Sequence, residues 1–146
     1  MLGVYFSATG NTKYCVEPLV KKLDKKSETL SIEDPKTLTA IQHSNSFIFG
    51  YGVRFSNVPK IVHDWILTNK SIFNGKKILI VATMGAFRGD GSGCAARLFQ
   101  KCGAKIVGGL HLRMWTAWFT TLPPGRWSSA MTQTQGTPPS AIFPVR

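Results

Sequence analysis

Short apolar runs alternate with amphipathic segments from residue 2 to about residue 112 of this chain. The amphipathic segments predict helices that begin at residue 11, follow residue 57 and cover roughly residues 92–102. An alternating order of this kind is typical of the α/β class, in which helices cover both faces of a parallel sheet. The runs that predict the strands cover residues 2–6, 29–33, 46–51, 77–83 and 105–112.

The run at residues 77–83 is nearly continuous in β-branched and aliphatic residues, which predicts a central strand buried on both faces. Pro18 lies inside the first predicted helix and is expected to bend it. Asn57 and Pro59 predict the cap and the first turn of the second helix. The apolar stripe of that helix consists of Val58, Ile61, Val62, Trp65 and Ile66.

Three of the predicted strands end, at Phe6, Gly50 and Thr83, in loops rich in glycine. In an open α/β sheet, ligands bind beyond the carboxyl ends of the strands, near the point where the strand order reverses. We therefore expect these three loops to form one binding site.

The first of these loops has the composition of a phosphate site. The free N–H groups and the dipole of a helix start favour an anion, and the side chains of Ser7, Thr9, Asn11 and Thr12 would add donors. Gly10 permits a left-handed turn. The glycine and lysine spacing of a Walker loop is missing, as are the three glycines of a dinucleotide fingerprint. A polar turn that merely caps the helix is the alternative. The loop comprises Ser7, Ala8, Thr9, Gly10, Asn11 and Thr12.

The segment Val4–Thr12 (VYFSATGNT) closely resembles the phosphate-loop motif of the flavodoxin family. The resemblance is closest to the flavodoxin-like domain that bacterial proteins fuse to a two-cluster ferredoxin, and it covers roughly residues 1–113. FGYG at 49–52 followed by NVPK at 57–60, and ATMGAF at 82–87 followed by GDG at 89–91, look like the two flavin loops of that subgroup. The resemblance implies a doubly wound, five-stranded parallel sheet of order 2-1-3-4-5 that holds flavin mononucleotide (FMN) at its strand ends.

The resemblance also implies a set of cofactor-binding residues. Tyr51 or Phe55, together with Phe87, would flank the isoalloxazine ring, although packing in the core or on the surface is an equal alternative for each. Backbone at Gly50, Gly52 and Gly85 would lie near the edge of the ring. Asp90 is expected to cap the following helix rather than to contact the flavin. Besides the loop at 7–12, the full set is Gly50, Tyr51, Gly52, Phe55, Thr83, Met84, Gly85, Ala86, Phe87, Gly89 and Asp90.

No catalytic or metal-binding residue is predicted. The histidines at positions 43, 63 and 111 are expected to be structural or exposed, with His43 in a polar loop. The cysteines at positions 15, 94 and 102 lack a C-x-x-C spacing and the four-cysteine run of an iron–sulfur site, so we expect small buried thiols in a reducing, cytoplasmic setting. The sequence contains no stretch of 18 consecutive apolar residues, so no membrane span is predicted.

The chain changes character after residue 114, which divides it into a predicted FMN-binding domain (1–114) and an irregular tail (115–146). The tail is rich in Trp and Pro, and no Asp or Glu follows Asp90. The helix that should end a sheet of this kind is missing from the pattern. Three explanations stay open: a tail that packs irregularly on the sheet, a disordered tail, or the product of a frameshift.

The formal net charge of +11 favours an anionic partner. Residues 1–114 alone carry 16 basic and seven acidic side chains, a balance of +9. We therefore expect an electron carrier, or the flavin module of a small reductase. Its expected partner is an acidic redox protein, either ferredoxin-like or a reductase, rather than nucleic acid. An FMN-dependent quinone or protoporphyrinogen-type oxidoreductase is the enzymatic variant. The alternatives are a non-redox module that binds nucleic acid or an acidic protein, and an inactive truncated product.

Overall fold

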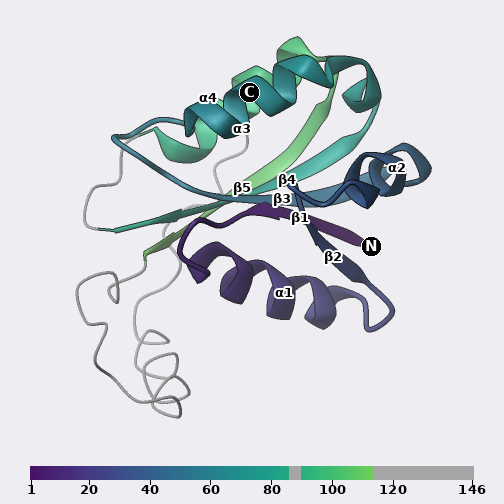
Figure 1. The fold of residues 1–146 in the computed structure, drawn as a ribbon, viewed down its shortest axis with the longest axis horizontal. Helices are drawn as coiled ribbons and strands as arrows, with labels where there is room; N and C mark the ends of the chain where they lie inside the picture. Colours follow the sequence, from purple (N-terminus) through teal and green to yellow (C-terminus); the bar gives the residue numbers. More distant parts are fainter. Residues whose placement is uncertain (86–89, 114–146) are drawn as a thin grey trace.

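The computed structural model describes residues 1–85 and 90–113, which form one sheet with helices on both faces (Figure 1). Ala86, Phe87, Gly89 and the predicted tail at 115–146 lie outside the described residues. The strands are β1 (Leu2–Phe6), β2 (Glu28–Ser31), β3 (Ser46–Gly52), β4 (Lys77–Met84) and β5 (Lys105–Arg113). The helices are α1 (Asn11–Leu23), α2 (Lys36–His43), α3 (Lys60–Thr68), the short 3₁₀ helix η1 (Lys70–Phe73) and α4 (Gly91–Lys101).

The five strands are parallel and lie in the order β2-β1-β3-β4-β5, which confirms the predicted fold class. The chain first adds β2 on one side of β1 and then returns to add β3 on the other, so the strand order reverses between β1 and β3. Phe6 pairs with Tyr51, and Gly52 pairs with Thr83. This register brings the carboxyl ends of β1, β3 and β4 to the same edge of the sheet.

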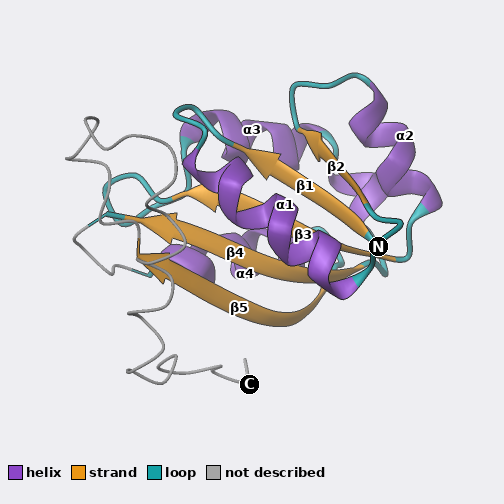
Figure 2. Ribbon diagram, turned by 90° about the horizontal axis from the view of Figure 1, so that it is seen from below, coloured by secondary structure: helices purple, strands orange, loops and turns teal. Residues whose placement is uncertain are grey.

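One face of the sheet is covered by α1, and the other by α2, α3 and α4 (Figures 1 and 2). The larger core lies on the second face and is built around aromatic rings. Phe49 packs edge-on against Phe99 with 5.0 Å between ring centroids, and it stacks on Trp65 at 6.0 Å. Phe73 from η1 contacts Phe99 at 5.1 Å, so residues from four elements hold this layer together.

On the opposite face, the smaller core is formed by α1, which lies close to the strands beneath it. Val16 and Val20 are fully buried against Ile48 and Val81. A Cβ atom at Gly50 would lie 2.2 Å from the Cγ2 atom of Val16, so the glycine is what allows the close approach of the helix. The function of Gly50 in the described structure is therefore helix packing.

Several local expectations differ from the structure. Ile61 does not join the buried stripe of α3, since 49% of its surface is exposed. The side chain of Asn57 accepts a hydrogen bond from the adjacent Val58 N–H (2.8 Å) instead of capping α3, and Pro59 occupies the N-cap position. Helix α1 continues through Pro18 to Leu23, and the bend expected at Pro18 stays a prediction.

Helix α2 was not expected, and His43 is its last residue rather than part of a loop. None of the helices described in residues 1–85 and 90–113 is long and apolar enough to cross a membrane.

Candidate functional site

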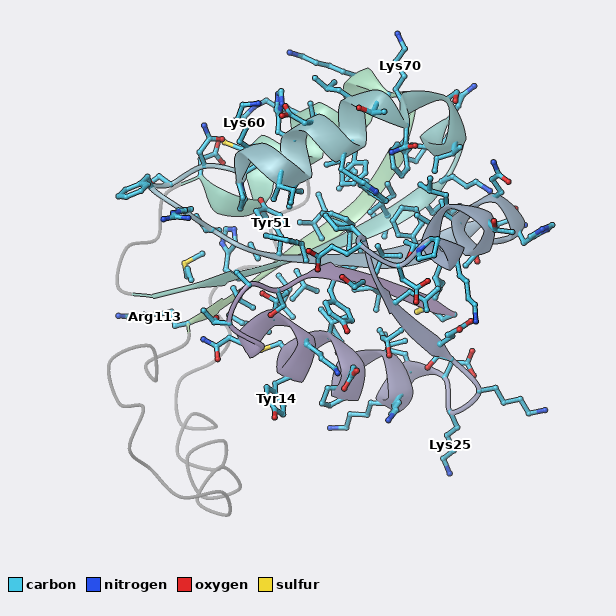
Figure 3. The ribbon with its side chains drawn as sticks, in the orientation of Figure 1. Tyr14, Lys25, Tyr51, Lys60, Lys70 and Arg113 are labelled. Carbon is cyan, nitrogen blue, oxygen red and sulfur yellow. The ribbon has the colours of Figure 1, made fainter. Side chains whose placement is uncertain are left out.

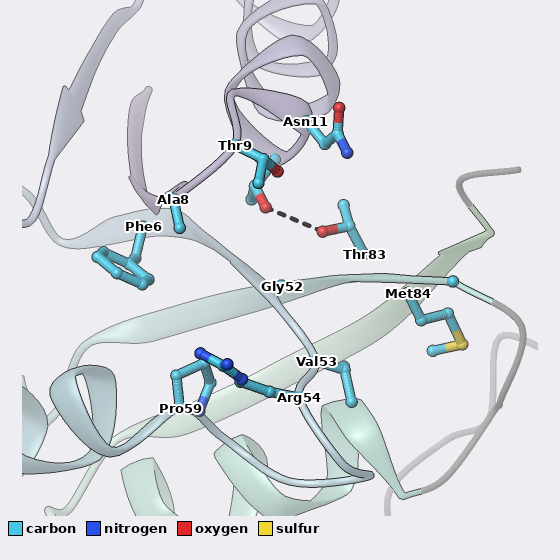
Figure 4. A pocket seen from close by; sticks show the side chains of 12 residues that line it. Phe6, Ala8, Thr9, Asn11, Gly52, Val53, Arg54, Pro59, Thr83 and Met84 are labelled. Atoms are coloured by element: carbon cyan, nitrogen blue, oxygen red, sulfur yellow. Dashed lines mark hydrogen bonds between the residues drawn. The ribbon is translucent and has the colours of Figure 1, made fainter. Parts of the chain in front are cut away.

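A pocket of about 280 Å³ lies where the carboxyl ends of β1, β3 and β4 meet (Figure 4). This is the place at which the strand order reverses, where open α/β sheets bind ligands. Eight predicted site residues line the pocket: Ala8, Thr9, Asn11, Thr12, Gly52, Thr83, Met84 and Gly85. Phe6, Val53, Arg54 and Pro59 line it as well and were not predicted.

The loop between β1 and α1 presents unused hydrogen-bond donors. Gly10 adopts a left-handed conformation with φ of 84°, and its carbonyl accepts the first helical hydrogen bond, from Tyr14 N–H (3.1 Å). The Ser7 hydroxyl oxygen accepts the N–H of Thr12 at 3.1 Å. Among the described residues, no acceptor takes the backbone N–H groups of residues 8–11. A turn with free N–H groups at a helix start is suited to an anion.

The Thr12 hydroxyl does not serve as the free donor that was expected. Its oxygen lies 2.9 Å from the Thr83 hydroxyl, and both threonines are buried. The Thr83 hydroxyl donates its single proton to the carbonyl of Tyr51 (3.3 Å), so Thr12 must be the donor to Thr83. These two hydrogen bonds join α1, β4 and β3 beneath the pocket. Thr9 and Asn11 are left as the polar side chains of the loop that reach the pocket.

The Tyr51 ring does not flank the pocket. It is 0% exposed, lies 6.1 Å from the Phe49 ring, and donates its hydroxyl hydrogen to the carbonyl of Gly91. Burial raises the pKa of this hydroxyl well above its ordinary value. The structure therefore corrects the expectation for Tyr51: its ring is a core residue that ties β3 to the start of α4.

Phe55 is the other aromatic residue that was predicted on this loop, and its side chain is 93% exposed. Phe55 and Ser56 both have positive φ values, 49° and 60°. The residues on either side, Arg54 and Asn57, exchange backbone hydrogen bonds of 3.1 and 3.0 Å. The result is a two-residue turn whose tip projects beside the pocket, in a backbone conformation that is costly for a bulky side chain.

Asp90 stands at the N-cap position of α4, yet its side chain caps nothing. The carboxylate instead forms a salt bridge with Arg97, seven residues further along the chain, with 2.5 Å between Oδ2 of Asp90 and Nη2 of Arg97. The Ser92 N–H donates to Nε2 of His111 (3.0 Å), which gives this histidine a structural function at the helix start. The expectation of a side-chain cap from Asp90 is therefore wrong.

The cysteines and the remaining histidines form no chemical cluster. Within residues 1–85 and 90–113, no group of three His, Cys, Asp or Glu side chains could hold a metal ion. Cys102 is buried as expected, whereas Cys15 and Cys94 are half-buried. Burial raises the pKa of the thiols of Cys15 and Cys102, which disfavours their reactive thiolate form. His63 lies at the surface beside Asp64 (3.2 Å).

Solved structures share this fold at low sequence identity. An archaeal flavodoxin superposes with a TM-score of 0.69 and 18% identity, over 77% of this chain and 82% of that one. The flavodoxin of Fusobacterium nucleatum bound to flavin mononucleotide gives 0.60 and 17%, over 92% and 96% of the two chains. The rubredoxin:oxygen oxidoreductase of Desulfovibrio gigas gives 0.66 and 11%, over 92% of this chain and 34% of the other.

A comparison with curated protein sequences gives no match. The narrower resemblance to flavodoxin–ferredoxin fusion proteins is not tested by these comparisons and stays a prediction. The model of the flavodoxin domain family, by contrast, matches residues 2–105, which is more than half of the sequence and includes all three loops of the pocket. The chain therefore belongs to the flavodoxin family.

Proposed function

We propose that this protein binds FMN in the pocket at the carboxyl end of the sheet and transfers electrons through it. The observation that carries the proposal is the turn at residues 8–11, whose backbone N–H groups have no acceptor among the described residues and lie at the start of α1. The flavodoxin of Fusobacterium nucleatum, which has the same fold, is a complex with flavin mononucleotide.

The residues present fit such a group. Backbone N–H groups of residues 8–11, with the side chains of Thr9 and Asn11, would hold the phosphate. Gly52 and Gly85 leave space at the sheet edge: a Cβ atom at Gly85 would meet nothing within 4 Å. When bound, the isoalloxazine ring supplies the redox chemistry by taking up and releasing electrons. Of the described aromatic residues, Phe6 lines the pocket and Phe55 is exposed on the adjoining turn, so both are candidates to contact that ring.

Electron transfer fits the chemistry of the pocket walls. The described lining residues include no Asp, Glu, His, Cys or Lys, so none of them offers a carboxylate, an imidazole, a thiol or an amine for acid–base or nucleophilic catalysis. The excess of basic side chains supports an acidic protein as the redox partner. None of the three cysteines, all of them among the described residues, forms a disulfide, which supports a reducing compartment that we take to be the cytoplasm.

The proposal is tested by titrating the purified full chain with FMN and with riboflavin, following flavin fluorescence. We expect one FMN per chain, and riboflavin at least about tenfold weaker because it lacks the phosphate. Gly10→Ala, which forces a side chain into the left-handed turn, should weaken FMN binding by about tenfold or more and leave riboflavin binding nearly unchanged.

Gly75→Ala is the matched control. Gly75 also has a positive φ, 72°, and a Cβ atom there would have nothing within 4 Å, so the backbone strain is similar while the position is remote from the lining residues. This variant should bind FMN like the parent protein. A chain that binds FMN and riboflavin equally would contradict the phosphate site. A colourless chain that takes up no flavin and binds DNA with a steep salt dependence would favour the non-redox alternative.

A further inference from the structure

Arg54 is the only charged residue among the described residues that line the pocket. The other described lining residues are apolar or neutral and polar, and no carboxylate is among them. Because the described wall carries no other charge, the guanidinium contributes a positive potential to the pocket.

Among the described residues, the guanidinium has no ionic partner. All seven carboxylate side chains of the protein belong to the described residues, and none forms a salt bridge with Arg54. Arg97, by comparison, is held by Asp90 at 2.5 Å. The contact that Arg54 does make is with an aromatic face: its Cζ atom lies 6.0 Å from the centre of the Phe55 ring.

The backbone fixes the position of this residue. Arg54 and Asn57 close the two-residue turn through reciprocal hydrogen bonds, and Phe55 and Ser56 within it have positive φ values. A strained turn of this kind persists only when its surroundings hold it, and such turns gather at functional sites. Arg54 thus enters the pocket from a defined backbone rather than from a long loop.

The side chain also lies on the wall opposite the phosphate turn. Figure 4 shows Arg54 beside Pro59 on one side of the pocket, with Thr9 and Asn11 across from them. A phosphate held by the N–H groups of residues 8–11 would therefore be remote from the guanidinium. The part of FMN that would face Arg54 is then the ring system.

We propose that Arg54 is the residue of this pocket that favours the reduced, negatively charged flavin over the oxidised, neutral one. The proposal rests on FMN binding, as argued above. Uptake of two electrons and one proton by the neutral ring leaves one negative charge on its pyrimidine half. A guanidinium on the pocket wall would stabilise that negatively charged product and leave the neutral, oxidised ring nearly unaffected.

The test compares the parent protein with Arg54→Gln, Arg54→Lys and Lys25→Gln. Lys25→Gln is the matched control: it removes one positive charge at the end of the molecule remote from Arg113 and the strand ends (Figure 3). For each protein, FMN and riboflavin titrations give the affinity for the oxidised flavin. Equilibration with a reference dye of known potential then gives the ratio of the affinities for reduced and oxidised flavin.

We expect Arg54→Gln to lower the ratio of reduced to oxidised affinity about tenfold, which corresponds to about 30 mV for a two-electron couple. Arg54→Lys should retain part of the ratio because it keeps the charge but not the fork of donors. Lys25→Gln should change it less than twofold. The affinity for oxidised FMN should stay within about threefold in all four proteins.

Two results would overturn the inference while leaving the proposed function in place. One is an Arg54→Gln protein that binds FMN with the same ratio as Lys25→Gln. The other is equal weakening of oxidised and reduced FMN without any change for riboflavin, which would assign Arg54 to the phosphate. A parent protein that binds no FMN would overturn the proposed function and this inference together.

Discussion

Tyr51 shows how one side chain can serve the core at a position where the sequence suggests a ligand. Its ring is buried against Phe49, and its hydroxyl donates to the Gly91 carbonyl at the start of α4. A tyrosine beside a glycine-rich strand end fits either function, and sequence reasoning could not decide between Tyr51 and Phe55. The decision depends on which face of β3 the Tyr51 side chain occupies, and on the turn beyond β3 that exposes Phe55.

Tyr51→Phe should lower the free energy of unfolding by about 1–2 kcal/mol at neutral pH, because it leaves the buried Gly91 carbonyl without its donor. The pH dependence provides a second readout. The folded pKa of Tyr51 is raised above the unfolded value of about 10, so the unfolded chain releases the proton first. The stability that the neutral hydroxyl provides is therefore complete below about pH 10 and declines as the pH rises from there toward the folded pKa.

Urea unfolding of the parent and of Tyr51→Phe, measured at about pH 8 and again above about pH 10, checks this expectation. The two conditions lie below and above the ordinary tyrosine pKa of about 10. The difference between the two proteins should shrink on the alkaline side. Tyr14→Phe is the control, since Tyr14 is 74% exposed on α1 (Figure 3) and should behave like the parent. If the difference in the free energy of unfolding between the parent and Tyr51→Phe stayed constant with pH, the fold would not hold the hydroxyl in its neutral form.

Arg54 and Thr12 mark the limit of prediction at the same scale. The composition of residues 7–12 predicted a polar turn at a helix start, and the structure has that turn. The buried hydrogen bond from Thr12 to Thr83 joins residues 71 positions apart, and no local pattern reveals it. Arg54 reads in the sequence as one more basic residue among 18, and only the assembled pocket distinguishes it.

At the scale of elements, the predicted strands and three of the helices are present, and α2 is the exception. The reason lies in its buried face, which consists of Thr37 and Ile41. Thr37 is fully buried because its hydroxyl donates to the carbonyl of Ser31 at 2.5 Å, so a polar residue stands where an apolar one would have revealed the helical period. Of its eight residues, Ile41 is the one buried apolar side chain, and Leu38 and Ala40 are half-buried.

The packing of α1 on the sheet depends on Gly50 and offers a test at this scale. Gly50→Ala places a methyl group 2.2 Å from Cγ2 of Val16, so the helix must move or strain. We expect a loss of about 1–3 kcal/mol in the free energy of unfolding, measured by urea denaturation. FMN binding should weaken as well, because the start of α1 carries the phosphate turn.

The cause can be isolated with a second substitution. In a Val16→Ala background the clashing methyl groups are gone, so adding Gly50→Ala should cost less than half of what it costs in the parent. Gly85→Ala, where a Cβ atom meets nothing within 4 Å, should leave stability unchanged. A Gly50→Ala cost that persists in the Val16→Ala protein would place the effect in the strand backbone rather than in helix packing.

At the scale of the whole molecule, the net charge can be read directly from the sequence, and folding does not change the number of charged side chains. Residues 1–114 carry a balance of +9, and the described pocket walls contribute only the positive Arg54. Part of this charge has a local explanation, since Lys21 and Lys22 lie in the last turn of α1 and Lys101 in that of α4, where helix dipoles favour cations. The remaining excess extends its field into solvent, where it acts on any charged molecule that approaches.

That field predicts how the salt concentration controls electron transfer from the reduced, FMN-loaded protein to small oxidants. Ferricyanide is an anion, so its reaction should slow severalfold as the salt concentration rises from about 0.01 M to about 1 M and the screening length falls from about 30 Å to about 3 Å. A trivalent cobalt ammine complex is repelled by the same field, so its reaction should become faster over the same range. Stopped-flow absorbance of the flavin measures both rates.

The two rates must change in opposite directions as the salt concentration rises, because a general effect of salt on the fold or on the flavin would move both rates in the same direction. If ferricyanide instead became faster with salt, the potential at the pocket would be negative, and an acidic redox partner would no longer be the expected one.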